Sequence, residues 1–327
     1  MKRKLLRIML TFLTISIFLI IGINLFVRLP RFGKLPDGER KSRIEKSPNF
    51  KDGDFKNLNY TPQMTGEGGF IKILKDMFNA KNRRPVDLIP SVKTDLLNLE
   101  RDKDILVWFG HSSYFMQIDG KRFLVDPVFC GNASPFSFLI KSFEGTDIYT
   151  PDDIPEIDYL FITHDHWDHL DYKSISKLKP KISKVITTLG VGSHLKRWGY
   201  DPKIIIENDW YDEVQLEDGF VVNVTPARHF SGRGTKPNQS LWASFVLQTP
   251  STRIFIGGDG GYDEHFAEIG EKFGSFDLAI LENGQYNTSW KYIHMMPNEV
   301  LQAAKDLKAK RLFPVHNSKF ALANHSW

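Results

Sequence analysis

The chain has 327 residues, with 43 Lys or Arg against 39 Asp or Glu, and 41% of its residues are hydrophobic. This composition is typical of a globular protein and excludes a disordered chain. A lone Cys130 excludes both an intramolecular disulfide and a metal site built from several thiolates. Residues 1–46 hold 11 Lys or Arg and three Asp or Glu, so the rest of the chain is slightly acidic. That distribution argues against nucleic-acid binding.

The first 27 residues indicate a membrane anchor. Residues 1–7 form a basic tail, and the 20 residues from 8 to 27 contain no charged side chain. As a helix they would span roughly 30 Å, the thickness of a bilayer hydrocarbon core. A cleaved signal peptide has a shorter apolar region and a small-residue cleavage site, whereas this segment ends in Phe26, Val27 and Arg28. We therefore expect a single-pass protein of the cell membrane. Because basic residues flank both ends of the segment, the sequence does not decide on which side of the membrane the folded body lies.

The remainder divides into a polar segment and a folded domain. Residues 28–103 contain several prolines and glycines, so we expect a linker or a segment that wraps around the body. Ile71–Asn79 predicts a short amphipathic helix within it. From residue 104 to 327, short apolar runs alternate with helical patterns. This order predicts an α/β sandwich with two sheets inside and helices outside.

The elements of this domain can be placed from their apolar runs. The expected strands are Ile105–Phe109, Tyr114–Ile118, Arg122–Val125, Tyr159–Thr163, Lys184–Thr187, Ile204–Ile206, Val221–Thr225, Ala243–Gln248, Arg253–Ile256, Leu278–Leu281 and Arg311–Pro314. The expected helices are Asp171–Lys179, Gly190–Trp198, Tyr262–Phe273 and Pro297–Leu307. Asp119-Gly120 predicts a hairpin turn between two of the strands.

One run of residues points to a metal site. His164, His166, Asp168 and His169 lie within six residues, directly after the expected strand Tyr159–Thr163. Burying three imidazoles and a carboxylate together is costly unless they coordinate something. Zn²⁺ accepts imidazole nitrogen and carboxylate oxygen, and a donor set without thiolate also suits Fe or Mn. Three further candidate donors follow later expected strands: His229, Asp259 and His316.

The motif and its flanks resemble a known family. His-x-His-x-Asp-His after a strand, with later His, Asp and His donors, is similar to the metallo-β-lactamase-fold hydrolases. Four flanking segments resemble the N-acyl-phosphatidylethanolamine-hydrolysing phospholipase D branch and its bacterial relatives: Trp108–Ser113, Leu124–Phe129, Ala227–His229 and Phe320–Ala323. The resemblance implies a metallo-β-lactamase-like four-layer αββα sandwich, here preceded by one N-terminal transmembrane helix.

The resemblance also implies a site for two metal ions, with zinc expected and iron or manganese as alternatives. By position, the ligands of the first ion are His164, His166 and His229, and those of the second are Asp168, His169 and His316. Asp259 would bridge the two ions. Two adjacent cations lower the pKa of a bridging water and neutralise the charge that develops on a phosphoryl or acyl oxygen.

Other side chains have candidate roles beside the metals. Asp168 and Asp259 are expected to influence the nucleophile. The resemblance places His294 near the substrate, where it would contact the phosphate or protonate the leaving group; a plain loop histidine is the alternative. Asp126 and His111 are candidates for holding a ligand by a hydrogen bond, against a turn carboxylate and a structural histidine.

Substrate contacts have weaker signals. Arg228 would meet an anionic headgroup or simply pair with a carboxylate. Tyr286 and Trp290 would line the substrate pocket or pack in the core. The apolar run Ser134–Ile140 would form a lid or a lipid-contacting lip, or else a short helix packed on the core.

These features favour a membrane-anchored hydrolase with phospholipase D-type cleavage of N-acyl-phosphatidylethanolamine or a related phospholipid. Its expected partners are the phospholipid substrate and the membrane surface, and a homodimer stays open. The alternative is lactone or other ester hydrolysis of a small soluble substrate at the same dinuclear site. A binding protein with a retired site is disfavoured by the complete donor set. The resembled family usually continues beyond the segment matching Phe320–Ala323, which suggests a C-terminal truncation.

Overall fold

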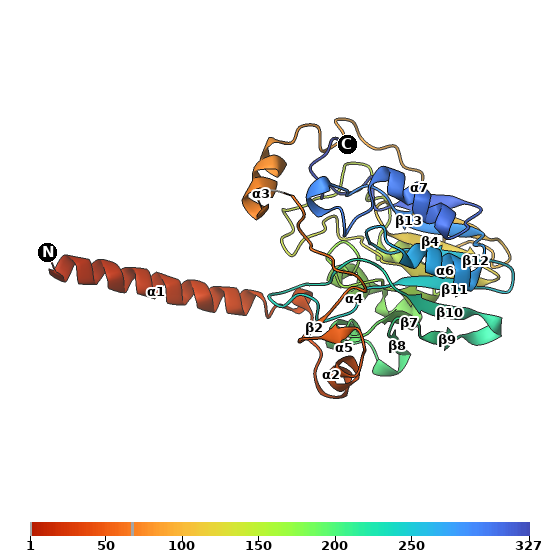
Figure 1. Cartoon of the computed structure of the whole chain (residues 1–327), viewed down its shortest axis with the longest axis horizontal. Coiled ribbons are helices and arrows are strands. Elements are labelled where there is room, and N and C mark those ends of the chain that lie inside the picture. Colours follow the sequence, from red (N-terminus) through yellow and green to blue (C-terminus); the bar gives the residue numbers. More distant parts are fainter. Residues whose placement is uncertain (1, 67–68) are drawn as a thin grey trace.

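Two sheets packed face to face form the body, with helices on both outer faces (Figure 1). The computed structural model describes residues 2–66 and 69–327. The first sheet has the order β3 (Ile105–Trp108), β4 (Tyr114–Ile118), β5 (Lys121–Val125), β6 (Ile157–Phe161), β7 (Ile182–Thr188) and β8 (Ile205–Asn208). The second has the order β14 (Leu312–Val315), β13 (Leu278–Glu282), β12 (Arg253–Ile256), β11 (Ser244–Gln248), β10 (Val221–Thr225) and β9 (Glu213–Gln215).

Three apolar layers hold this sandwich together. Between the sheets, side chains such as Phe161 of β6 and Phe245 of β11 meet edge to face at 5.3 Å. The outer face of the first sheet packs against α4 (Tyr172–Leu178) and α5 (Gly192–Arg197). The outer face of the second packs against α6 (His265–Phe273) and α7 (Pro297–Asp306). The four-layer αββα sandwich that the sequence predicts is therefore confirmed.

Strand direction brings the carboxyl ends of several strands to one edge. Strands β5, β6, β7 and β8 run parallel to one another, and so do β12, β13 and β14. Strand β10 pairs antiparallel with β11, which pairs antiparallel with β12, so β10 points the same way as β12. In α/β sheets, ligands bind in the crevice outside these carboxyl ends.

The predicted strands and helices of the body are all present, with shifts of a few residues at their ends. Strand β9 was not predicted, because its sequence Glu-Val-Gln is short and polar and sits at the edge of its sheet. Ser134–Ile140 does not form the packed helix considered as an alternative; it is a loop of turns and bends. The exposed fractions of its Phe138 and Leu139 are 69% and 45%.

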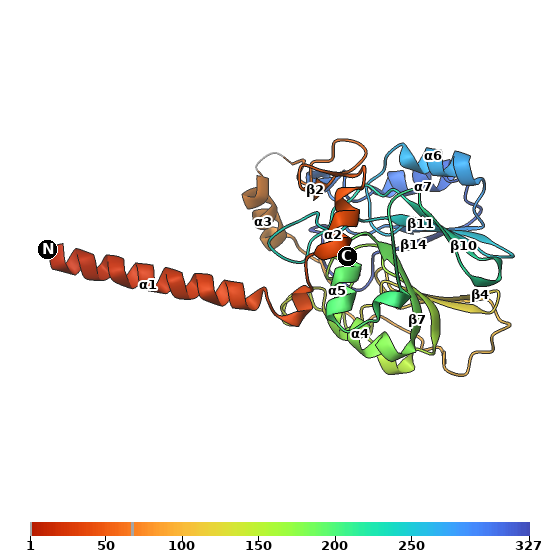
Figure 2. The same cartoon turned by 90° about the horizontal axis from the view of Figure 1, so that it is seen from below.

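The N-terminal helix α1 (Lys2–Phe26) projects from the body (Figures 1 and 2). Its residues Arg3–Phe26 are long and apolar enough to cross a membrane, and none of that span is buried against the rest of the chain. At its end, the Phe26 ring stacks on Phe136 at 5.0 Å and meets Phe32 edge to face at 5.1 Å. The C-terminal end of α1 therefore rests on the apolar loop Ser134–Ile140.

The segment after α1 lies against the body. It contains the short helix η1 (Pro30–Phe32), α2 (Gly38–Glu45) and a small hairpin of β1 (Phe50–Lys51) and β2 (Asp54–Phe55), followed by α3 (Gly69–Asn79). The helix predicted over Ile71–Asn79 is confirmed by α3. Helix α2 was not predicted, because only Ile44 of its residues is buried and most others are charged. Tertiary contacts hold it instead: Arg40 forms an ion pair with Glu207.

Candidate metal centre

The His-rich motif forms a loop between β6 and α4. Thr163 follows β6, and the Asp171 carboxylate caps α4 by accepting hydrogen bonds from the backbone N–H groups of Lys173 and Ser174. The loop is therefore anchored at both ends, by a sheet strand and by a helix cap. This anchoring presents the intervening histidines at the carboxyl edge of the first sheet.

Three of the predicted donors converge. His166 Nδ1 lies 2.9 Å from His164 Nε2 and 3.2 Å from His229 Nε2. Tetrahedral bonds of 2.0–2.1 Å to a metal ion separate neighbouring nitrogens by about 3.3 Å, so the spacing suits one ion. His229 Nδ1 donates to the Ile293 carbonyl at 2.9 Å, which orients Nε2 toward the other two rings.

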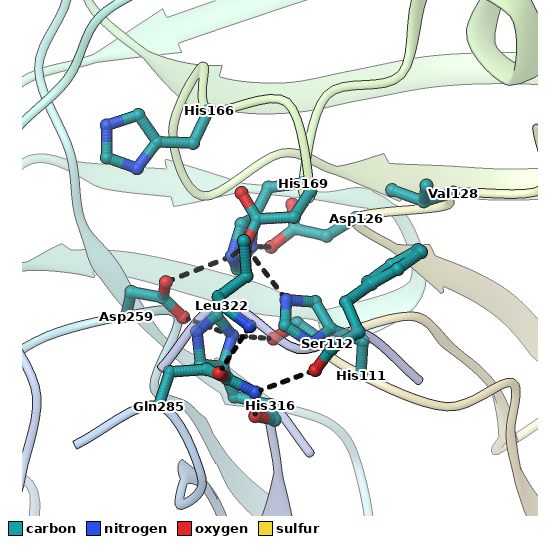
Figure 3. A network of polar contacts seen from close by, with 12 residues as sticks. His111, Ser112, Asp126, Val128, His166, His169, Asp259, Gln285, His316 and Leu322 are labelled. Carbon is teal, nitrogen blue, oxygen red and sulfur yellow. Dashed lines mark hydrogen bonds and ion pairs between the residues drawn. The ribbon is translucent and has the colours of Figure 1, made fainter. Parts of the chain in front are cut away.

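The second predicted set also comes together. One ligand atom from each of Asp168, His169 and His316 lies within 4.8 Å of the others, and His111 joins the same group. Figure 3 shows Asp259 between His169 and His316. Asp259 Oδ2 lies 3.0 Å from His169 Nε2, and Oδ1 lies 3.0 Å from His316 Nδ1. Asp259 Oδ2 also lies 3.9 Å from His229 Nε2, so this carboxylate adjoins both sets.

The pKa directions of three of the histidines fit metal ions, whereas nearby carboxylates raise the pKa of the buried His169. Burial holds the pKa values of His164, His229 and His316 well below the ordinary value, so their rings are neutral and can offer lone pairs. Burial alone would raise the pKa of Asp259, but His169 and His316 keep it well below its usual range. Among the described residues, no hydrogen-bond donor is aligned with the buried Asp259 Oδ1. A cation between the two donor sets would satisfy that oxygen.

Neighbouring side chains orient the donors. Asp126 accepts hydrogen bonds from His169 Nδ1 at 2.8 Å and from the Thr163 backbone N–H at 2.9 Å. His111 Nε2 donates to Asp168 Oδ2 at 2.8 Å. The structure thus places both Asp126 and His111 where the sequence analysis expected ligand-holding groups. Such partners fix the tautomer and direction of a ligand.

A cavity of about 470 Å³ opens over the donors. Of the predicted substrate contacts, His294 and Trp290 line this cavity. Tyr286 and Arg228 are not among its lining residues, which corrects the prediction of a common pocket for Tyr286. Its ring stacks on His325 at 4.3 Å.

Arg228 takes the alternative role, pairing with a carboxylate. Its Nε lies 3.4 Å from Asp263 Oδ2, and its guanidinium donates to the Tyr60 and Tyr262 carbonyls. These contacts lie outside the metal cavity and tie the wrapping segment to the body. These contacts favour the alternative of a carboxylate pair for Arg228, and its headgroup role stays a prediction.

Two residues that support the site were not predicted from the sequence. Glu282, at the carboxyl end of β13, is 1% exposed and lies 3.3 Å from His294 Nδ1. Although burial opposes it, this carboxylate raises the pKa of His294. Glu282 could have been identified from the sequence, because it is an acidic residue at the end of an apolar strand. Asn57 of the wrapping segment hydrogen-bonds both the N–H and the carbonyl of His229, and nothing in the local sequence marks it.

Imidazoles and carboxylates that converge where two sandwiched sheets end are typical of one class of protein, the metal-dependent hydrolases with the metallo-β-lactamase fold. Residues 121–317 match the Beta-lactamase superfamily domain, and the chain belongs to this superfamily.

Several proteins share its sequence or fold. An uncharacterized Mycobacterium tuberculosis protein is 37% identical over 294 residues, covering 86% of this chain and 77% of that one. N-acyl-phosphatidylethanolamine-hydrolyzing phospholipase D 1 of Caenorhabditis elegans is 31% identical, covering 64% and 62%. The mitochondrial enzyme of that name from Saccharomyces cerevisiae is 34% identical, covering 66% and 48%. The metallo hydrolase Igni18 of Ignicoccus hospitalis shares the fold, with a TM-score of 0.50, 23% identity and coverage of 65% and 82%.

Proposed function

We propose that this protein is a membrane-anchored, dinuclear zinc-dependent hydrolase that cleaves N-acyl-phosphatidylethanolamine or a related phospholipid at the phosphodiester bond, as a phospholipase D does. If α1 spans the membrane, it would hold the active site near the membrane surface. The names of the worm and yeast relatives support the reaction, and the donor set supports two metal ions.

The observation that carries the proposal is the apolar wall of the metal cavity. Beside the donors, the lining includes Met64, Met77, Phe230, Trp290, Ile293 and Leu322. Such a wall suits acyl chains, while the polar floor suits a phosphate. A small, polar, soluble substrate would have no use for so much apolar surface.

Helix α3 extends this wall toward the membrane side. Met77 lines the cavity, whereas Ile71 and Phe78 of the same helix are 80% and 88% exposed. Figures 1 and 2 both show α3 on the side of the body from which α1 extends. An exposed apolar helix face next to a membrane anchor is suited to lie in the lipid interface. A lipid could thus pass from the bilayer into the cavity along α3.

The protein side chains have separable tasks in this reaction. Two bound cations would supply Lewis acidity toward water and toward the phosphoryl oxygens. The seven predicted donors would hold them: His164, His166, Asp168, His169, His229, Asp259 and His316. His294, whose pKa the neighbouring Glu282 raises, lines the cavity and would give its proton to the leaving alkoxide. Trp290 would position the acyl-bearing part of the lipid.

The test is release of phosphatidic acid from N-acyl-phosphatidylethanolamine by the detergent-solubilised full chain, with and without a chelator. Metal content is measured on the same sample. Release that the chelator abolishes, with about two zinc ions per chain, supports the proposal. Two metals without release would reject this lipid, and a panel of lactones and other esters would follow. Release that resists the chelator would reject the metal mechanism.

A further inference from the structure

A second cavity, of about 250 Å³, lies at the base of the anchor helix. It begins at Val27, directly after α1, and continues between the wrapping segment, α5 and the loop after β10. Five of its lining residues are cationic: Arg28, Lys34, Arg197, Arg233 and Lys236. The body as a whole is slightly acidic, so this concentration of positive charge is local.

Little negative charge balances these cations inside the cavity. Asp165 is the one carboxylate among the lining residues. It is 4% exposed, and its oxygens accept hydrogen bonds from the Gly232 backbone N–H at 2.7 Å and from Ser240 Oγ at 2.8 Å. His194 Nε2 lies 3.2 Å from the same carboxylate. Because five cations stand against this one carboxylate, the lining keeps a net positive charge. Outside the lining, Asp37 pairs with Lys34 at the exposed rim.

Arg233 forms the buried part of the cavity wall. It is 4% exposed, and its Nε has no hydrogen-bond partner among the described residues. Its Nη atoms are occupied, because they donate to the carbonyls of Asp165 at 2.8 Å, Leu170 at 2.6 Å and Arg31 at 2.9 Å. A buried guanidinium N–H without an acceptor is costly and favours an anion.

The folded body, rather than a flexible tail, shapes this cavity. Trp198 Nε1 donates to the Pro30 carbonyl at 2.7 Å, and His194 Nδ1 accepts from the Lys34 backbone N–H at 3.0 Å. Gly33 has a φ of +69°, and a Cβ there would lie 1.9 Å from the His194 ring. The backbone of the juxtamembrane segment is thus fixed against α5, which gives the cations that it carries defined positions along the cavity.

We propose that this cavity binds the phosphate of an anionic phospholipid headgroup. Because α1 ends one residue before the cavity, a membrane-spanning α1 places it at the level of the headgroups. Basic juxtamembrane groups attract anionic lipids, and arginine binds phosphate through charge-assisted hydrogen bonds. A free phosphate ion shares this chemistry, but the position at the end of the anchor favours the lipid. This site is separate from the metal cavity and independent of the proposed substrate.

The bound headgroup would contact the residue that supports the metal motif. Arg233 donates to backbone carbonyls at both ends of that loop, and its guanidinium lies 4.0 Å from the centre of the Trp167 ring. Trp167 in turn meets Phe32 of the juxtamembrane segment at 5.1 Å. One anionic lipid would therefore join the anchor, the wrapping segment and the motif loop.

The test uses native mass spectrometry of the delipidated, chelator-treated full chain in detergent. The probes are dioctanoyl phosphatidylglycerol, dioctanoyl phosphatidylcholine and inorganic phosphate. We expect phosphatidylglycerol to bind at least about tenfold more tightly than phosphatidylcholine, and phosphate to compete weakly. In a double variant, Arg28→Ala with Lys236→Ala, phosphatidylglycerol affinity should fall about tenfold or more. The matched control, Lys305→Ala with Lys308→Ala, removes two exposed cations near α7 and should leave binding unchanged.

Three outcomes would overturn the proposal. Equal affinity for the two lipids would show that charge does not matter. Phosphate binding as tight as phosphatidylglycerol binding would assign the cavity to the free ion. Loss of phosphatidylglycerol binding in Trp290→Ala, but not in the double variant, would place the lipid in the metal cavity. Because the metals are removed, none of these results depends on the hydrolase reaction.

Discussion

The loop from Thr163 to Asp171 separates two cavities of opposite character. On one side, His166 and Asp168 line the metal cavity, and His164 belongs to the same set of donors. On the other, Asp165 lines the basic cavity at the base of α1, and Trp167 packs against Arg233 of its wall. Neighbouring residues of one loop therefore serve two different cavities.

The two cavities differ in how far their side chains are held in place before a ligand binds. The donors of the metal cavity are buried and oriented before any ligand arrives, so little reorganisation is needed on binding. The cations of the basic cavity sit mainly at its rim, where solvent and salt weaken their attraction. We therefore expect strong, slowly exchanging metal binding beside weak, exchangeable lipid binding.

The largest expected effect comes from Asp259, the carboxylate between the two donor sets. Asp259→Asn keeps the shape but removes the charge, so it should reduce metal content and lower lipid hydrolysis by at least about 10³-fold. Metal analysis and phosphatidic acid release measure both. An unchanged circular dichroism spectrum would show that the fold survives. Wild-type activity in this variant would refute the metal mechanism.

The next effect separates His294 from the metal ligands. His294→Gln removes the proposed proton donor and should lower kcat by about 10²-fold, while leaving the zinc content near two ions per chain. A drop in zinc content would instead identify His294 as a ligand, since its ring also lies near His229 and Asp259. Steady-state kinetics and metal analysis on one preparation decide between these roles.

Asp126 tests how far the metal cavity depends on its supporting partners. Asp126→Ala removes the acceptor that orients His169, and should weaken metal retention by about 10–100-fold. Competition with a chelator measures the change. Glu271→Ala, an exposed carboxylate on α6, is the matched control and should retain metal as the wild type does. Equal retention in both variants would contradict the orienting role.

His265, a buried histidine outside both cavities, makes it possible to distinguish unfolding at acid pH from loss of metal at acid pH. Burial lowers the pKa of His265 to about 4. In the unfolded chain this histidine keeps its ordinary pKa of 6.5, so between pH 6.5 and pH 4 the unfolded chain binds the proton more readily than the folded protein does. The free energy of unfolding therefore falls as the pH drops through this range. Between pH 7 and pH 5 the loss should be roughly 2 kcal/mol. Urea unfolding of wild type and His265→Phe measures it, and the same loss in both would exclude His265 as the cause.

The smallest effect is a response to salt that only one cavity should show. Raising NaCl from 50 to 500 mM shortens the Debye length from about 14 Å to about 4 Å, and should weaken phosphatidylglycerol binding several-fold. Zinc content should not change over that range, because coordination bonds to buried donors are little screened. Lipid binding that ignores salt would point to acyl-chain contacts rather than to the cations.

The sequence predicted those parts of the site whose chemistry is local or regularly placed. The motif His164–His169 is visible because its donors are adjacent, and His229, Asp259 and His316 because each follows an apolar strand at the same sheet edge. It could not decide between Trp290 and Tyr286 as cavity residues, because both lie in one irregular loop. Only packing turned the first toward the metals and the second toward His325.

By itself, the sequence determined the long apolar N-terminal helix, the order of the sandwich and the candidate metal donors, because hydrophobic length, strand periodicity and clustered ligands are properties of short segments. Tertiary structure alone decided the rest. Asn57 reaches His229 only because the wrapping segment packs over the body. The same packing brings the Tyr60 carbonyl to the Arg228 guanidinium, which donates a hydrogen bond to it. The basic cavity joins residues from four separate segments. Contacts between distant segments depend on how the chain packs, and no local pattern records that.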